Sequence, residues 1–165
     1  MNRGGVVKIL AVNPSKCTGC RLCELACSLR NAGEFNPSRS RLRVIGFEEL
    51  FSLPVTCFQC EKPHCAEVCP TGAITRDETS GVVKVSKEAC TGCKICTLAC
   101  PFGNIVFSTD VKRAVKCELC DHVPECADIC PTGALEFKEA DNATLYKRRM
   151  LSEKLKGIYG GVEAL

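Results

Sequence analysis

The hydrophobic positions of this chain fall into short runs separated by polar turns. Runs rich in β-branched residues predict five short strands, at Val6–Val12, Ala73–Arg76, Val82–Val85, Ile105–Phe107 and Leu135–Phe137. The second and third strands flank a polar turn that ends in Gly81, which predicts a β-hairpin. No apolar run approaches the roughly twenty residues that a membrane-spanning helix needs. The pattern predicts a small α+β protein with no direct membrane span.

A different pattern begins after Glu139. The segment Asp141–Tyr159 starts with two capping residues and is followed by two glycines, as expected for a helix. Four aliphatic residues fall roughly on one face of that helix, namely Leu145, Leu151, Leu155 and Ile158. We therefore expect a C-terminal helical tail at residues 139–165, which either packs on its own domain or docks on a partner subunit.

Cysteine accounts for 16 of the 165 residues, so composition alone suggests either a disulfide scaffold or a metal protein. The N-terminal sequence "MNRGGVVKILAVNPSKC" has neither the apolar core of a secretory signal nor a twin-arginine pair. In a reducing compartment, clustered cysteines usually bind metal. We therefore expect a cytoplasmic metal-binding protein, with export in complex with a signal-bearing partner as the alternative.

The sixteen cysteines form four groups of four. The first and third groups, "CTGCRLCELAC" and "CTGCKICTLAC", share the spacing C-x2-C-x2-C-x3-C. The second and fourth groups, "CFQCEKPHCAEVCP" and "CELCDHVPECADICP", have wider central gaps and end in Cys-Pro. This alternation indicates an internal duplication. The first and third groups start 73 residues apart and the second and fourth 60 apart, so the first copy contains thirteen extra residues, within residues 28–56.

The spacing is typical of iron–sulfur ligation. Three cysteines at C-x2-C-x2-C lie on a tight loop that can wrap three corners of a cubane. The fourth cysteine is expected to begin a helix and to point toward a different cluster, as in two-cluster ferredoxins. Ser28 follows the first group where the other groups have proline, which allows the first helix to continue. Little else could form a conventional core, so we expect the clusters to serve as the hydrophobic centre.

Residues 57–107 resemble a bacterial-type two-cluster ferredoxin. Residues 6–138 resemble the four-cluster electron-transfer subunits of the dimethyl sulfoxide reductase, formate hydrogenlyase and carbon monoxide dehydrogenase ferredoxin type. This resemblance implies one domain at residues 1–138, built from tandem ferredoxin-like modules with pseudo-two-fold symmetry. It also implies nested pairing of the cysteine groups, with half A formed by residues 17–27 and 117–130 and half B by residues 57–69 and 90–100.

The same resemblance implies four [4Fe–4S] clusters and their ligands. The implied ligand sets are Cys17, Cys20, Cys23 and Cys130; Cys117, Cys120, Cys126 and Cys27; Cys57, Cys60, Cys65 and Cys100; and Cys90, Cys93, Cys96 and Cys69. His64 and His122 lie inside the second and fourth groups, but every group already has four sulfurs. We therefore expect both histidines to pack beside the clusters or to tune them, not to ligate them.

The formal charge of +3 treats every cysteine as neutral. Sixteen thiolates would remove sixteen charges and four oxidised cubane cores would return about +2 each, so the loaded protein would carry about −5. The basic excess is therefore internal compensation. The chain also lacks tryptophan and has only 5% aromatic residues, which argues against stacking on bases. We expect no nucleic-acid partner.

The chain shows no nucleophile–base pair, phosphate loop or dinucleotide fingerprint. We therefore predict a non-catalytic electron-transfer subunit that works between a catalytic oxidoreductase subunit and an electron acceptor. Self-association is a further alternative. Two rival readings are a structural or assembly iron–sulfur protein and a zinc-dependent interaction module, although zinc modules usually draw two ligands from each of two knuckles.

The stretch "GEFNPSRSRLRV" resembles the ferredoxin-like subunits that accompany tungsten-containing aldehyde oxidoreductases. This resemblance implies a catalytic partner with a tungsten or molybdenum pterin site. A hydrogenase, a formate dehydrogenase or a carbon monoxide dehydrogenase is the alternative partner. Within the stretch, Ser38–Val44 is expected to form a strand with a solvated edge, or alternatively a docking rim for the partner.

The cysteine count leads to a test of stoichiometry. Anaerobically purified protein should contain close to sixteen irons and sixteen inorganic sulfides per chain, because four complete sets of ligands leave no cysteine over. Iron and sulfide analysis together with the visible spectrum measures this, and the spectrum also separates iron–sulfur from zinc. A reproducible value near twelve irons after reconstitution would contradict at least one of the four sites.

Overall fold

The computed structural model describes residues 7–47 and 51–140, in which short helices alternate with short strands. The helices are α1 (Leu22–Ala32), α2 (His64–Glu67), α3 (Ile95–Ala99) and α4 (Glu125–Asp128). The strands are β1 (Lys8–Val12), β2 (Arg43–Phe47), β3 (Phe51–Val55), β4 (Ile74–Arg76), β5 (Val83–Val85), β6 (Ile105–Ser108), β7 (Arg113–Lys116) and β8 (Leu135–Glu139). Single 3-10 turns occur at Pro14–Lys16 and Pro37–Arg39, and a turn with positive φ values occurs at Leu119–His122. None of the described helices is long and apolar enough to cross a membrane.

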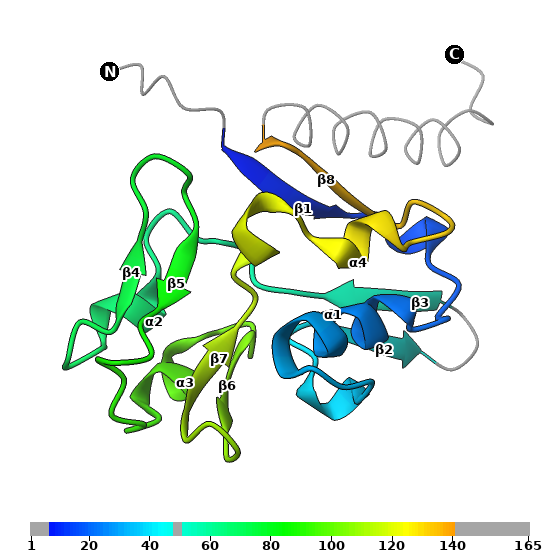
Figure 1. The fold of residues 1–165 in the computed structure, drawn as a ribbon. Helices are drawn as coiled ribbons and strands as arrows, with labels where there is room; N and C mark the ends of the chain where they lie inside the picture. The colour runs from blue at the N-terminus through cyan, green and yellow to red at the C-terminus, as the bar shows by residue number, and fades with distance from the viewer. Residues whose placement is uncertain (1–6, 48–50, 141–165) are drawn as a thin grey trace, which may run out of the picture.

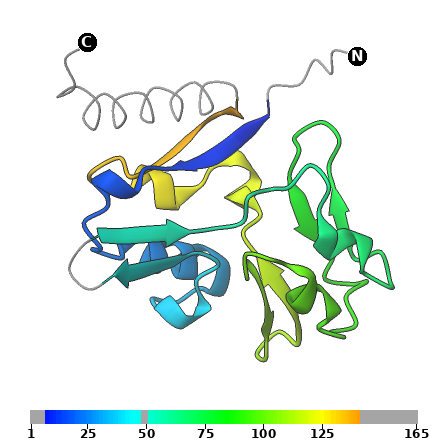
Figure 2. The same ribbon diagram turned by 180° about the vertical axis from the view of Figure 1, so that it is seen from behind.

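The described strands form four antiparallel pairs, β1–β8, β2–β3, β4–β5 and β6–β7. The β1–β8 pair joins the two ends of the described chain, in a register that runs from Lys8 opposite Glu139 to Val12 opposite Leu135. These two strands lie side by side in both views (Figures 1 and 2). In sequence order, the β1–β8 pair therefore encloses all the other described strands, and the β4–β5 hairpin lies at the middle of the order.

The helices follow the same nesting. Helix α1 packs against α4, while α2 packs against α3. In Figure 1, α1, α4, β1 and β8 lie on one side of the molecule, and α2, α3, β4 and β5 lie on the other. The β2–β3 and β6–β7 hairpins belong to the segments that connect the two sides. The structure is thus α+β, with small ferredoxin-like units built from short hairpins.

Several predicted elements are confirmed. The hairpin at residues 73–85 is β4–β5, and the strands predicted at residues 105–107 and 135–137 are β6 and β8. The first predicted strand begins at Lys8 in the described chain. The tail helix predicted at residues 139–165 lies outside the described residues, apart from Glu139 and Ala140.

The strand expected at Ser38–Val44 is wrong for most of its length. Residues 37–39 form a 3-10 turn, and β2 begins only at Arg43. The Asn36 side chain caps this turn by accepting a hydrogen bond from the Ser38 backbone N–H at 3.1 Å. Pro37 follows the cap at the first position of the turn, where its fixed φ is favourable. Local side-chain bonding therefore overrides the alternating pattern.

The fourth cysteine of each group lies within a helix, at its C-cap or just after it, instead of beginning a helix as predicted. Cys27 lies inside α1, Cys100 is the C-cap of α3, and Cys69 and Cys130 follow α2 and α4. The third and fourth cysteines are four residues apart, which is close to one helical turn. Their side chains can therefore project from one face at different heights along the axis.

Helix α1 continues past its cysteines, as expected from Ser28. The Ser28 hydroxyl is fully buried, donates to the Leu25 carbonyl at 2.9 Å and accepts from the Asn36 N–H at 3.1 Å. The helix ends at Gly33, whose φ is 76° and whose N–H donates to the Leu29 carbonyl at 2.9 Å. Ser28 therefore extends the helix and also fixes the segment that follows it.

The buried apolar residues form two clusters that both contain cysteine. One cluster joins Leu42, Val44, Leu119 and Leu135 to Cys23, Cys27, Cys117 and Cys126, among others. The second joins Ile74, Val83, Val85 and Ile105 to Cys96, with Cys65, Cys69, Cys90 and Cys100 packed against it. Aliphatic side chains therefore surround the sulfur atoms on both sides of the molecule, consistent with the cysteines lying at the centre of each core.

Gly92 illustrates how tightly the cysteine loops are built. Its φ is +74°, and a Cβ at this position would lie 2.9 Å from the Lys112 carbonyl oxygen and 3.1 Å from Phe107 Cε2. Gly33 has a similar φ of +76°, but an added Cβ there meets nothing within 4 Å. The two glycines therefore separate the cost of backbone conformation from the cost of steric contact.

We expect Gly92→Ala to destabilise the loaded protein more than Gly33→Ala does. Both variants incur the left-handed backbone cost of about 1–2 kcal/mol, but only Gly92→Ala must also displace a backbone carbonyl. Thermal unfolding of the anaerobically purified variants, followed by the visible absorbance, measures the difference. Equal midpoints for the two variants would contradict the close approach at Gly92.

Candidate iron–sulfur sites

The structure gathers the cysteines into four sets, each drawn from two sequence groups. We name them in the order of their position across the fold. The first set is Cys17, Cys20, Cys23 and Cys130, and the second is Cys27, Cys117, Cys120 and Cys126. The third set is Cys57, Cys60, Cys65 and Cys100, and each of these three sets lines its own cavity. The fourth set is Cys69, Cys90, Cys93 and Cys96, in which burial and then the charges of the other three members raise the pKa of Cys96.

All sixteen cysteines are free thiols in this structure, with no disulfide among them. A single zinc ion would bring four thiolates to within roughly 4 Å of one another, given its bond length to sulfur. Within residues 7–47 and 51–140, no three or more His, Cys, Asp or Glu side chains form a group arranged to hold one metal ion. The cysteines of the first three sets line cavities.

The backbone of the cysteine loops is shaped to donate hydrogen bonds. In the first group, Gly19 and Arg21 have φ values of 72° and 58°, and in the third group Gly92 and Lys94 have 74° and 67°. Alternating left-handed residues turn successive N–H groups toward one concave side, a geometry found at many anion and iron–sulfur sites. The loop of the fourth group has four consecutive left-handed residues, Leu119 to His122. This geometry fits a negatively charged cluster whose sulfurs accept N–H bonds.

Burial dominates the acidity of most of the thiols. It raises the pKa of Cys23 to about 12, although a hydrogen bond from the Glu24 backbone opposes it. Burial, followed by the charges of Cys117 and Cys27, also raises the pKa of Cys126. Burial is likewise the main cause of the raised pKa values of Cys57, Cys65, Cys96 and Cys120. Cluster binding must therefore displace protons from these sulfurs, so loading and proton release are coupled.

Two sulfurs behave in the opposite way. Burial acts to raise the pKa of Cys69, but hydrogen bonds from the Thr71 hydroxyl and from three backbone N–H groups lower it. The pKa of Cys130 is also lowered, because bonds from the Leu135 backbone and the Thr132 hydroxyl outweigh burial. The hydroxyl oxygens of Thr71 and Thr132 lie 3.7 Å and 3.9 Å from the two sulfurs. Both threonines belong to the repeated phrase "CPTGA", which is the sequence signal that could have revealed them.

The neighbours of Cys27 were not anticipated from the sequence. Its sulfur accepts a hydrogen bond from the Arg41 backbone N–H at 3.3 Å and from Asn31 Nδ2 at 3.6 Å. Arg41 and Asn31 both come from the segment between the first and second groups. This segment therefore contacts a candidate cluster ligand directly.

Gln59 and Lys116, which also had no assigned role, lie between the second and third sets. Gln59 Nε2 donates to the Cys117 carbonyl at 2.9 Å, and its Oε1 accepts from the Val83 N–H at 2.9 Å. The Lys116 ammonium is buried at the same junction. A polar network therefore connects the two halves of the molecule where two cysteine sets approach each other.

The two histidines lie at the edges of the sites. His64 is largely exposed and its Nδ1 lies 3.1 Å from Glu67 Oε2, while the residue also lines the cavity of the third set. The His122 ring lies 6.3 Å from the Phe137 ring, centroid to centroid. The structure gives both rings contacts with side chains other than cysteine.

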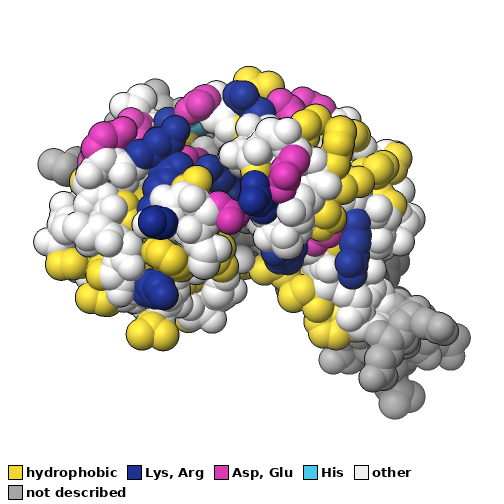
Figure 3. All heavy atoms as spheres, turned by 60° about the horizontal axis from the view of Figure 1, so that its bottom comes forward, with side chains coloured by type: hydrophobic (Ala, Val, Ile, Leu, Met, Phe, Trp, Pro, Cys, Tyr) yellow, Lys and Arg dark blue, Asp and Glu magenta, His cyan; other side chains and the backbone are white. Residues whose placement is uncertain are grey.

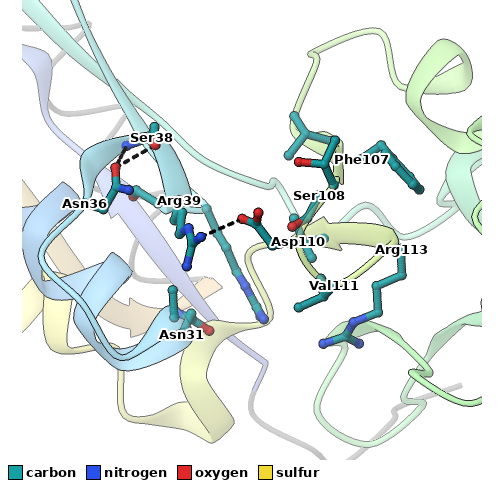
Figure 4. Close-up of a pocket in the computed structure, with 15 residues that line it drawn as sticks. Asn31, Asn36, Ser38, Arg39, Phe107, Ser108, Asp110, Val111 and Arg113 are labelled. Atoms are coloured by element: carbon teal, nitrogen blue, oxygen red, sulfur yellow. Dashed lines mark hydrogen bonds and ion pairs between the residues drawn. The ribbon is translucent and has the colours of Figure 1, made fainter.

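A groove of about 570 Å³ separates residues 31–41 from the β6–β7 hairpin. Figure 3 shows a hollow between two lobes, with Lys and Arg side chains gathered around it. The close-up shows Arg39 reaching across the groove to Asp110, and the two groups lie 3.0 Å apart (Figure 4). Arg41 also lines the groove and pairs with Glu118 at 3.4 Å. The docking rim predicted at residues 38–44 thus borders a real groove, but its role in docking stays a prediction.

Comparison with known proteins identifies the family. A family model described as a 4Fe-4S dicluster domain matches residues 48–155, and a second with the same description matches residues 16–73. The "Putative electron transport protein YsaA" of Escherichia coli K12 is 38% identical over 154 residues, covering 86% of this chain and 96% of that protein. The "Aliphatic sulfonate oxidoreductase, polyferredoxin-like subunit" of Pyrococcus furiosus is 40% identical over 121 residues, covering 73% of this chain and 70% of that protein.

A similar solved structure is the BamBC active site complex of benzoyl coenzyme A reductase, which aligns with a TM-score of 0.45 at 25% identity and covers 96% of this chain and 92% of that one. The sixteen cysteines and the two dicluster matches fit four [4Fe–4S] clusters. The names of the relatives describe electron-transport proteins and polyferredoxin-like or electron-transfer subunits of oxidoreductases. The chain therefore belongs to the 4Fe-4S dicluster, ferredoxin-like family of non-catalytic electron-transfer subunits.

Proposed function

We propose that this chain conducts single electrons along a row of four [4Fe–4S] clusters between a catalytic oxidoreductase subunit and an electron acceptor. Each cysteine set defined above would hold one cluster, with three ligands from one group and the fourth from the paired group. The observation that supports this most is the convergence of each set from two distant groups around one site. When bound, each cluster supplies a one-electron redox centre, and the chain positions it and shields it from water.

The order of the row follows from which sulfurs influence each other. Burial and then the charges of its own set raise the pKa of Cys126 in the second set. The charge of Cys23 in the first set raises it further. The pKa of Cys57 of the third set is raised first by burial and, after the opposing effects of Lys116 and of the Gln59 backbone, also by the charge of Cys117 of the second set. The third and fourth sets share the packed helices α2 and α3. These neighbours support the order first, second, third, fourth.

The ends of the row lie nearest to solvent. Cys20 of the first set and Cys93 of the fourth set are exposed, whereas the other fourteen cysteines are buried or partly buried. Electron tunnelling falls steeply with distance, so an exchange partner must approach one of these two sulfurs. Each end of the row would therefore serve as a point where electrons enter or leave.

Helix α3 offers an apolar surface beside the fourth set. Leu98 is 89% exposed and Ile95 is 45% exposed, and both lie within five residues of Cys93. Exposed large apolar side chains that gather at a functional centre are typical of protein interaction sites. We propose that the catalytic subunit covers this end. The sequence also predicted that the tail at Asp141–Tyr159 docks on a partner subunit. Those residues lie outside the described ones, so this docking stays a separate prediction.

The chemistry of the partner is proposed from sequence likeness. The "GEFNPSRSRLRV" resemblance supports a catalytic subunit with a tungsten or molybdenum pterin site. One relative is named as a subunit of an aliphatic sulfonate oxidoreductase and another as a subunit of a thiosulfate reductase, so partners of this family act on varied substrates. A hydrogenase, formate or carbon monoxide dehydrogenase is the alternative partner, and chaining of copies through a free end is a further one. We propose a cytoplasmic location, where reduced thiols are available for cluster assembly.

A structural or assembly protein is the rival from another class. Its clusters would fold the chain or be delivered elsewhere, and would not need to cycle between redox states. Anaerobic redox titration separates the two functions. Reversible one-electron reduction of the clusters supports conduction, whereas loss of clusters on reduction or their transfer to an acceptor protein supports the rival.

The nested assignment predicts the effect of removing one ligand. Cys69→Ala should damage the cluster held by Cys90, Cys93 and Cys96, because Cys69 belongs to the fourth set although it follows the second group in sequence. Cys65→Ala is the matched control and should damage the third set instead. Iron content and the EPR spectrum of the reduced variants measure both. Two variants with the same damaged cluster would show that ligation is local within each group.

The proposed docking surface predicts that Leu98→Glu weakens the complex with the catalytic subunit by tenfold or more. The substitution puts a charge into the centre of an apolar contact without touching a cysteine ligand. Val123→Glu, at a residue that is 62% exposed and lies between Cys120 and Cys126, is the control and should leave binding unchanged. Co-purification of the co-expressed subunits, with tungsten and molybdenum analysis, measures association and tests the pterin assignment. Equal loss in both variants would contradict docking at α3.

A further inference from the structure

Lys116 is a buried cation at the centre of the molecule. It is the last residue of β7, and only 1% of its surface is exposed. No other lysine or arginine in residues 7–47 and 51–140 belongs to the buried class. Burying an ammonium group is costly unless hydrogen bonds and a countercharge compensate it. The surroundings of Lys116 should therefore show what compensates its charge.

The Lys116 ammonium has three acceptors for its three N–H bonds. It donates to the Val83 carbonyl, to the Cys117 carbonyl at 2.8 Å and to Gln59 Oε1 at 3.5 Å. All three partners are neutral oxygens, which can only accept hydrogen bonds. None of the described carboxylates forms an ion pair with it. The hydrogen bonds are complete, but a countercharge is not supplied by a protein acid.

The third cysteine set lies beside this charge. Lys116 lines the same cavity as Cys57, Cys60, Cys65 and Cys100. Burial raises the pKa values of Cys57 and Cys65, and the charge of Lys116 is the next largest influence on each and opposes that rise. The ammonium therefore lies close enough to these sulfurs to act on them through space.

The cations near the second set are compensated differently. Arg30 acts on Cys120 of the second set, but it is about half exposed and pairs with Glu125 at 3.5 Å. Arg41 contacts Cys27 through its backbone, and its side chain pairs with Glu118. The duplication makes the comparison sharper, because the residue before the second group is Thr56, a buried neutral side chain, whereas the residue before the fourth group is Lys116.

We propose that Lys116 raises the reduction potential of the cluster in the third set above those of the other three, so that an electron shared by the chain resides there. The proposal rests on the ligand sets of the proposed function. Reduction adds one electron, taken from the reduced donor subunit, to a [4Fe–4S]²⁺ core with four thiolates. The net charge of the site goes from −2 to −3, no bond is broken and no proton moves. A fixed positive charge stabilises the −3 state more than the −2 state.

The consequence is an internal store of one electron in the middle of the row. A cluster with a higher potential than its neighbours fills first and empties last. The donor and the acceptor can then exchange electrons with the chain at different times. This regulates the timing of transfer, and it is a property of the interior that does not depend on which catalytic subunit is bound.

The test is an EPR-monitored redox titration of the isolated four-cluster protein. Lys116→Met keeps the length of the side chain and removes the charge. We expect the highest of the four midpoint potentials to fall by about 59 mV or more. This shift corresponds to a tenfold or greater change in the one-electron reduction equilibrium. The other three potentials should stay in place. Cys60→Ser, which changes a ligand of the third set, should alter the same EPR signal and so identify it.

Three further variants complete the design. Lys84→Met removes an exposed lysine of β5 that pairs with Asp121 in the turn at Leu119–His122 at 2.8 Å, and it should leave all four potentials unchanged. Lys116→Arg retains the charge and should retain the potential. If Lys116→Met does not assemble four clusters, Lys116→Gln is used, because it keeps an N–H donor for the carbonyls but has no charge.

Each result decides the proposal. Unchanged potentials in the neutral variants, or a fall at a signal that Cys60→Ser does not alter, would overturn it while conduction by reversible clusters stands. Failure of both neutral variants to assemble clusters would replace the tuning role with one in assembly, and so would also overturn it. Irreversible reduction of the wild-type clusters would instead reject the proposed function itself.

Discussion

The negative charge of sixteen cysteine sulfurs constrains every other feature of this chain. A protein of 165 residues has little interior in which to distribute that charge. Burial alone keeps thiols such as Cys23 and Cys126 protonated, since it raises their pKa values. Iron–sulfur cores provide positive charge at the right places, and backbone N–H groups aimed by left-handed residues provide partial positive charge around them. The loops, the short helices and the small aliphatic clusters can all be understood as a shell for these charges.

Nested pairing determines how the shell closes. The groups of half B start at Cys57 and end at Cys100, so its two cysteine sets come from a local stretch of chain. Half A needs Cys17 and Cys130 together, and β1 can pair with β8 only when nearly the whole domain is present. Closing a longer loop costs more conformational entropy. Cross-links through clusters that join two groups each would offset that cost, which explains how such short strands and helices hold together.

Features that repeat along the chain could be predicted from the sequence. Local structure that depends on a single side chain could not. The cysteine spacing identified the groups, and the β4–β5 hairpin and β8 follow directly from alternating apolar residues. The β2–β3 hairpin was missed because Gly46 and Pro54 interrupt its pattern, although Pro54 pairs with Val44. The 3-10 turn at Pro37–Arg39 depends on one capping bond from Asn36. The place of the fourth cysteines in their helices was also missed, because a spacing of four residues fits the start and the end of a helix equally well.

The site shows the same division. Groups of cysteines could be recognised from the sequence, but the residues around their sulfurs could not, because those contacts join distant parts of the chain. Gln59 reaches Cys117 and Val83, and Arg41 reaches Cys27, from positions that no local motif marks. Thr71 and Thr132 are the exception, since the repeated "CPTGA" phrase places a hydroxyl two residues after each sulfur. Comparing the two copies therefore identifies the contacts that both share, but not the contacts that only one copy makes.

The differences between the copies are therefore the most informative part of the duplication. Two identical halves would give a symmetric row of clusters with no preferred resting place for an electron. Asymmetry enters at two points in the described structure, and both lie at the junction of the halves. One is the stretch between the first and second groups, in which the Asn31 side chain at the end of α1 and the Arg41 backbone N–H both donate to the Cys27 sulfur. The other is the residue before the second and fourth groups, neutral in Thr56 and charged in Lys116, both of them buried. A single charge at an otherwise equivalent buried position changes the local potential more than any exposed pair can, because water screens the exposed pair and not the buried charge.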